Sequence, residues 1–114
     1  MIKIDGIDPK MIANNLTSFE PMHPGEILKD EIEFRGVSQK KLAKEMGVSY
    51  TVLNEILNAK RPLSTEYAML IEAVLDLDAE PLLWMQTCYN LQMAKRDNKF
   101  MEKLNKVRKI AAIL

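Results

Sequence analysis

The residues best suited to chemistry lie between positions 39 and 61, where polar side chains alternate with aliphatic ones. Asparagine can form two hydrogen bonds with the edge of adenine, and threonine offers a hydroxyl group and a methyl group to a base pair. Thr51 and Asn54 therefore suit the reading of base edges in a DNA groove. The eight residues that we expect to contact DNA are Gln39, Lys40, Ser49, Tyr50, Thr51, Asn54, Lys60 and Arg61.

Two of these residues stand where phosphates are commonly held. Gln39 and Ser49 are expected at the N-termini of helices, where free amide groups and polar side chains bind anions. Lys60 and Arg61 follow the second of these helices and could clamp the DNA backbone. Lys40 adds positive charge to the first of these two helices.

The two helices that would position these side chains are short and joined by a tight turn. Serine residues are good N-caps, so Ser38 and Ser49 predict helices over 39–46 and about 50–58. Gly47 lies between them and can adopt the positive φ that ends a helix. This arrangement is typical of a helix-turn-helix.

The apolar spacing fixes which side of the second helix faces outward. Leu53, Ile56 and Leu57 recur at helical spacing and should be buried. Burial of these three residues turns Thr51 and Asn54 toward the solvent, and Tyr50 and Glu55 with them.

Further helices are expected on both sides. A helix over 24–34 has an apolar stripe of Ile27, Leu28, Ile32 and Phe34, a helix follows Ser64 to Leu75, and another begins near 78–81. The C-terminal stretch of the chain should form a helix with a narrow apolar seam of Phe100, Leu104, Val107, Ala111 and Leu114. This helix can fold back onto its own domain or pack against a second protomer. Residues 8–16 form either a short helix or a flexible arm, and 17–23 read as a linker.

Size and charge set further bounds. A chain of 114 residues supports one compact domain with an extension, and no apolar run reaches the roughly 20 residues of a membrane helix. A single cysteine, Cys88, excludes an internal disulfide and fits the reducing cytoplasm.

The net charge is zero, but residues 62–94 hold five acids and no base, whereas residues 95–114 hold seven bases and two acids. The local electrostatic field at a surface therefore matters more for the binding of a polyanion than the net charge of the whole chain.

Other reactive side chains have ordinary explanations. His23 is the only histidine and lacks a partner at metal-ligand spacing, so it is expected to begin the first helix. Cys88 is expected in the core, and Trp84 either anchors the core or contacts a partner. We therefore predict no enzyme activity, no cofactor and no metal.

Four stretches together resemble the HigA-type antitoxins, within the Xre and lambdoid-repressor helix-turn-helix class: residues 23–28 (HPGEIL), 38–43 (SQKKLA), 47–49 (GVS) and 53–61 (LNEILNAKR). The resemblance covers about residues 22–91. It implies an all-α fold, with a five-helix lambda-repressor-like domain at 22–92, an N-terminal extension at 1–21 and a basic C-terminal helix at 93–114 that is a possible dimerisation element.

The resemblance also implies a function. Members of this family are homodimers that bind operators in their own promoters, repress their operon and neutralise a HigB-type toxin, which is an mRNA endonuclease. The expected partners are thus operator DNA, a toxin and a second copy, in the cytoplasm. Tyr50 and Glu55 stand where relatives often have arginine. Two alternatives stay open: a repressor without a toxin, and an interaction module that has lost DNA binding.

Overall fold

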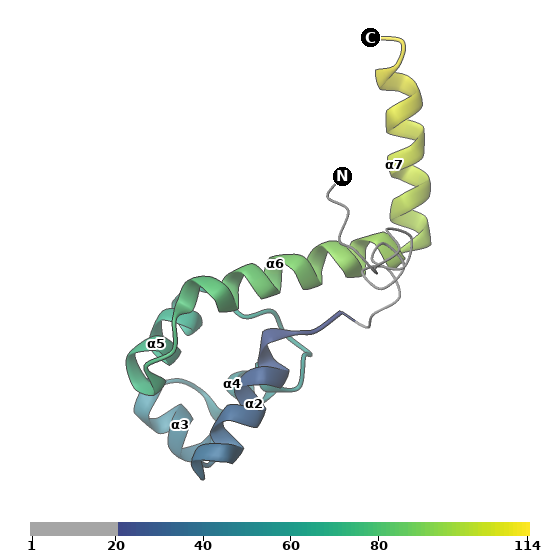
Figure 1. Cartoon of the computed structure of the whole chain (residues 1–114). Coiled ribbons are helices and arrows are strands. Elements are labelled where there is room, and N and C mark those ends of the chain that lie inside the picture. Colours follow the sequence, from purple (N-terminus) through teal and green to yellow (C-terminus); the bar gives the residue numbers. More distant parts are fainter. Residues whose placement is uncertain (1–20) are drawn as a thin grey trace, which may run out of the picture.

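The computed structural model describes residues 21–114, and every regular element in that range is an α-helix. Five helices, α2 to α6, pack into a head, and α7 projects away from it at the far end of α6 (Figure 1). This confirms the predicted five-helix domain with a C-terminal helical extension. The expected helix or arm at 8–16 lies outside the described residues. The helices are α2 (Pro24–Arg35), α3 (Gln39–Met46), α4 (Tyr50–Leu57), α5 (Thr65–Leu75), α6 (Ala79–Arg96) and α7 (Asn98–Ala111).

Serine side chains set the starts of three helices, as the sequence predicts. The Oγ atoms of Ser38, Ser49 and Ser64 accept hydrogen bonds from the amide three residues ahead, at 3.1, 3.5 and 3.2 Å. Each bond satisfies one amide that the first helical turn leaves without a partner. Gly47 ends α3 in the left-handed conformation with φ of 68°, which directs the chain from α3 into α4.

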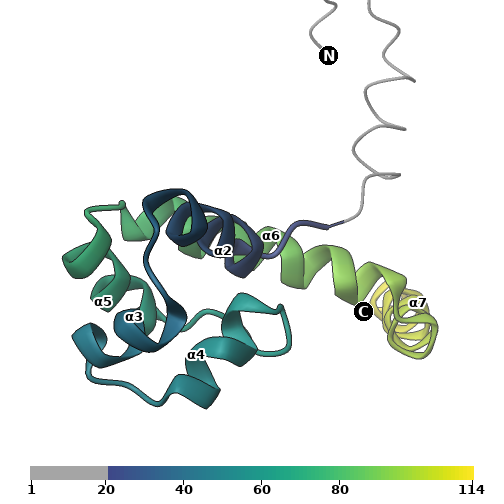
Figure 2. The same ribbon diagram turned by 90° about the horizontal axis from the view of Figure 1, so that it is seen from below.

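The core lies where α2, α3, α4 and α5 converge under the first half of α6. Figure 2 shows α4 at one edge of the head and α2 and α6 at the other. Every helix of the head contributes buried aliphatic side chains to one continuous cluster. Its largest members, all below 2% exposure, are Leu28, Ile32, Leu42, Leu53, Ile56, Leu57 and Ile71.

The start of α2 touches the end of α4 backbone to backbone. A Cβ atom on Gly25 would overlap the main-chain carbonyl of Ile56, so only glycine permits this approach. His23 is the N-cap of α2, and its buried Nδ1 accepts a hydrogen bond from the Gly25 amide at 2.9 Å. The His23 ring also packs edge-on against Tyr89, with 4.9 Å between ring centroids. His23 therefore begins the first helix of the head, as expected, and ties it to α6, while Gly25 brings the same helix against α4.

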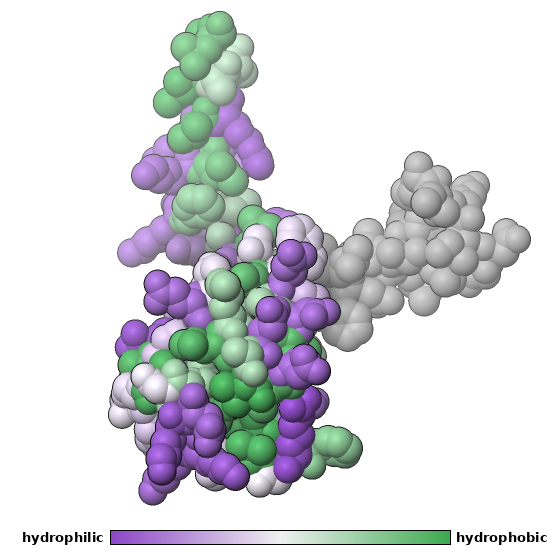
Figure 3. All heavy atoms as spheres, turned by 90° about the vertical axis from the view of Figure 1, so that its left-hand side faces the viewer, coloured by the Kyte–Doolittle hydropathy of each residue, from purple (hydrophilic) through white to green (hydrophobic). Residues whose placement is uncertain are grey.

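Several large apolar residues of the head are exposed, and Phe34 and Trp84 are the most exposed among them. Phe34 is 89% exposed and Trp84 is 69% exposed. The predicted apolar stripe of α2 is buried only at Leu28 and Ile32. Phe34 lies two positions after Ile32 and hence on the opposite helix face, and Ile27 is 37% exposed. Trp84 stands in the same relation to buried Leu82, so it is no core anchor. Figure 3 shows apolar side chains at the surface of the head and along projecting α7.

The long helix α6 continues past residue 92, where a domain boundary was expected, and ends at Arg96. Asp97 then accepts a hydrogen bond from the amide of Phe100 at 3.2 Å and so caps α7. Among residues 21–114, no helix combines the length and the apolar character needed to span a membrane.

Acidification should destabilise the head through His23. Burial lowers the pKa of the His23 imidazole, and its Nδ1 must stay unprotonated to accept from Gly25. The unfolded chain therefore binds the proton first, and the free energy of unfolding should fall as pH drops below about 6.5, by at most about 1.4 kcal/mol per pH unit. Urea unfolding at a series of pH values measures this slope.

The control is His23→Asn, because asparagine can still cap the helix but does not titrate. This variant should be less stable at neutral pH, yet lose less stability than the parent on acidification. Equal losses in the two proteins would contradict the assignment to His23.

Candidate nucleic-acid interface

Helix α4 presents polar residues on one side because its other side is buried. Leu53, Ile56 and Leu57 are each at most 1% exposed. Tyr50, at 43% exposure, and Thr51 lie on the open side at the start of the helix. The first turn of α4 is therefore accessible to a large ligand.

Asn54 lies one turn further on and is half-buried. Its Nδ2 donates a hydrogen bond of 2.7 Å to Oε1 of Gln39, the first residue of α3. This bond joins two of the predicted site residues across the helix-turn-helix. Since each side chain limits the rotamers of the other, the pair presents its polar atoms in a restricted geometry.

The remaining predicted residues lie at the start of α3 and at the two ends of α4. Ser49 is exposed at the N-terminus of α4, and Lys40 is exposed in the first turn of α3. After α4 the chain reverses through Ala59, which has a positive φ of 60°, and the Lys60 amide donates to the carbonyl of Glu55 at 2.8 Å. This turn holds Lys60 close to the end of α4.

Arg61 is close to α4 but is engaged by a carboxylate. Its Nη2 and Nε atoms lie 2.8 and 2.9 Å from Oε2 of Glu55. Both side chains are partly exposed, at 49% and 34% for Arg61 and Glu55. An exposed pair of this kind is weak, so a phosphate could compete with Glu55 for the guanidinium group.

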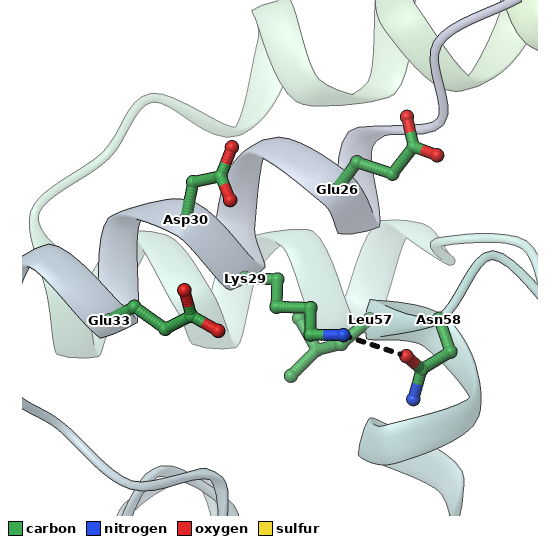
Figure 4. Close-up of a pocket in the computed structure, with 6 residues that line it drawn as sticks. All are labelled: Glu26, Lys29, Asp30, Glu33, Leu57 and Asn58. Carbon is green, nitrogen blue, oxygen red and sulfur yellow. Dashed lines mark hydrogen bonds between the residues drawn. The ribbon is translucent and has the colours of Figure 1, made fainter.

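Acidic residues bound the site on the α2 side. Figure 4 shows Glu26, Asp30 and Glu33 along α2, with Lys29 extending from among them to α4. The Nζ atom of Lys29 donates to Oδ1 of Asn58 at 3.1 Å. The carboxylates would repel a DNA backbone, so they limit how far a duplex can extend across this edge.

Sequence reasoning did not predict two of the contacts that these residues and their neighbours make. Neither the Gln39–Asn54 bond nor the contact from Lys29 to Asn58 was expected, because they join residues 15 and 29 positions apart. Within the described part of the chain, no group of three or more His, Cys, Asp or Glu residues could hold a metal ion.

Comparison with known proteins points to one family. The profile of the helix-turn-helix family matches residues 28–82. Virulence-associated protein I of Dichelobacter nodosus is 38% identical over 79 residues, which is 68% of this chain and 73% of that protein.

Two solved structures are similar in both sequence and fold. An addiction module antidote protein of the HigA family from Coxiella burnetii is 32% identical, with a TM-score of 0.66, over 75% of this chain and 95% of that one. The Pseudomonas aeruginosa antitoxin HigA, solved with the higBA promoter, is also 32% identical, with a TM-score of 0.66, over 70% of this chain and 88% of that one.

Proposed function

This chain belongs to the helix-turn-helix family, in the group of HigA-type antitoxins, and we propose that it represses its own operon by binding operator DNA and neutralises a HigB-type toxin. The observation that carries the DNA-binding half is the open polar side of α4. A promoter bound to a relative that is 32% identical supports it further. As a binding protein, it would need no catalytic site of its own.

Base recognition is assigned to the start and middle of α4. The major groove is about 12 Å wide and admits one α-helix. Thr51 and Asn54 would approach the base edges, and Tyr50 would lie against the groove wall. Because Gln39 already holds the Asn54 amide, little side-chain freedom remains to be lost on binding.

Phosphate contacts are assigned to residues that flank the reading side chains. Ser49, Lys40 and Lys60 are exposed and can bind the backbone directly. Arg61 would have to break its ion pair with Glu55 before its guanidinium group could bind a phosphate. The DNA backbone would thus be held at the start of α3 and at the two ends of α4.

The function further requires two copies and a toxin. One α4 covers only a short half-site, and a two-fold dimer places two such helices in successive grooves about 34 Å apart. The antitoxin half of the proposal rests on the HigA-family relatives, one of which is an addiction module antidote protein. Operon DNA and messenger RNA both lie in the cytoplasm, which is where such a protein would act.

Replacement of Asn54 should remove base discrimination. Asn54→Ala should weaken operator binding by about 1–3 kcal/mol and leave non-operator duplex nearly unaffected, if the amide pairs with one adenine. Fluorescence anisotropy with both duplexes at one salt concentration measures the ratio. The control Asn58→Ala removes an amide just beyond the same helix and should change both affinities alike. An unchanged ratio in Asn54→Ala would place the reading residues elsewhere.

Neutralising Glu55 should strengthen binding to any duplex. Glu55→Gln removes a charge that repels phosphate and leaves Arg61 without its carboxylate partner. If Arg61 then neutralises one further phosphate, the slope of log affinity against log salt should steepen by about 0.9. Arg61→Ala should instead weaken binding and flatten the slope. Glu80→Gln, with the same charge change on α6, is the matched control, and an equal effect there would exclude a local role for Glu55.

The toxin half is tested by co-expression with the product of whichever gene lies beside the one for this chain. A HigA-type antitoxin should co-purify with that protein and suppress its cleavage of messenger RNA in a translation assay. If the neighbouring product neither binds nor cleaves RNA, and the chain still binds its promoter, the protein is a repressor without a toxin. If the parent chain shows no salt-sensitive binding to its promoter, the DNA-binding half fails instead.

A further inference from the structure

The last helix has an apolar seam that residues 21–114, the part of the chain that the structure describes, leave uncovered. No residue of α7 is buried, and Phe100, Val107 and Ile110 are 44%, 51% and 61% exposed. In Figure 1, α7 points away from the head, so it cannot cover this seam by packing against its own core. A helix with one apolar side and one charged side normally packs that apolar side against a protein surface.

Basic residues border this seam on both sides. At 3.6 residues per turn, Lys103 and Arg108 fall on opposite flanks of the line through Phe100, Leu104 and Val107. Residues 95–114 hold seven bases and two acids. If two copies of α7 paired along their seams, these like charges would face each other and repel. The charge pattern therefore favours an acidic partner surface with an apolar floor.

The head contains such a surface between α2 and α6. Hydrophobic side chains line a groove there, and the carboxylates of Glu31 and Asp78 stand at its rim. Neither α3 nor α4 contributes to this groove, so it is separate from the DNA-reading side. The apolar lining residues are Ile27, Leu77, Pro81, Leu82 and Met85.

The groove continues into a second acidic hollow. Asp78 and Pro81 line both depressions, and Glu72 and Glu80 line the second. No lysine or arginine occurs from residue 62 to residue 94. On α2, Arg35 donates to Glu31 at 2.8 Å and to the carbonyl of Leu75 at 2.7 Å, so Arg35 and Glu31 neutralise each other. The negative charge of this surface therefore comes from Asp78, Glu72 and Glu80.

We propose that α7 of one copy docks in the groove between α2 and α6 of a second copy. Each copy offers one basic apolar helix and one acidic apolar groove, so the exchange closes into a two-fold dimer with two identical contacts. Phosphate binding would use the bases of α7 but not its apolar seam, which makes a protein surface the better match. This inference rests on the dimer proposed above and names its interface.

Charge reversal distinguishes this interface from direct pairing of two α7 helices. The dissociation constant of the full-length protein, measured by sedimentation without DNA, should rise roughly tenfold or more in Lys103→Glu with Arg108→Glu. Asp78→Lys should raise it similarly, and the combined variant should recover dimer strength. In direct α7 pairing, the α7 reversals would exchange facing positive charges for facing negative ones and leave the dissociation constant nearly unchanged, and Asp78→Lys would have no effect. That pattern, or a monomer at all concentrations, would overturn the proposal.

Two further variants test whether a weaker dimer could result from misfolding or from the change in net charge alone. Asp78 begins α6 but makes no side-chain capping bond, and thermal melting checks that Asp78→Lys still folds. Ile27→Lys puts the same unfavourable charge into the groove without touching a helix cap, and should also weaken the dimer. Glu66→Lys, an equal charge change on α5 outside the groove, should not.

Salt and DNA give independent readouts. Added salt should weaken a dimer held by opposite charges and strengthen one held against like charges. Operator binding is measured separately on each variant. Failure of the parent to bind its promoter while the dimer responds as described would remove only the DNA-binding function. Normal promoter binding with a dimer insensitive to the groove variants would remove only this inference.

Discussion

Burial of one side of α4 is the constraint on which the reading surface depends. Three aliphatic side chains, Leu53, Ile56 and Leu57, lie in the core. At roughly 1.5–3 kcal/mol for each buried side chain, they contribute several kilocalories per mole to holding this rotation of the helix. A single hydrogen bond such as that from Asn54 to Gln39 contributes only about 1 kcal/mol net. The apolar contacts therefore decide which way α4 faces, and the polar contacts adjust the side chains it presents.

The close approach of α2 to α4 makes this rotation hard to change. Gly25 lies against the backbone of Ile56, and His23 buries its ring beside Tyr89 while capping α2. A turn of α4 about its axis would bring side chains into a space that admits only backbone. The same contacts leave the far side of α2 open, where Ile27 and Glu31 line the groove toward α6. One packing arrangement thus produces two separate surfaces, one for DNA and one for a protein.

Local rules in the sequence predict most of the head. Ser38, Gly47 and Ser49 act on neighbouring amides, so their caps and turns could be placed without knowledge of the fold. The failures have a common cause. Phe34 is apolar, but which face of α2 is buried is set by contacts with other helices, and these bury Ile32 and so leave Phe34 on the opposite face; the bond from Gln39 to Asn54 likewise joins residues far apart in sequence. Asp97 was a local signal for the break between α6 and α7, since aspartate is a good N-cap.

The absence of net charge is easier to understand once the charges are placed in space. Binding to a polyanion is governed by the field where it docks, and Lys40, Lys60 and Arg61 lie close to α4 whatever the total. The acids of the head and the bases of α7 cancel in the sum but lie at separate ends of the molecule (Figure 1). The basic helix α7 of one copy is therefore complementary in charge to the acidic groove of another copy. Because joining two copies would neutralise the acidic groove, dimerisation would also reduce the repulsion between the head and an approaching duplex, so the two binding events would favour each other.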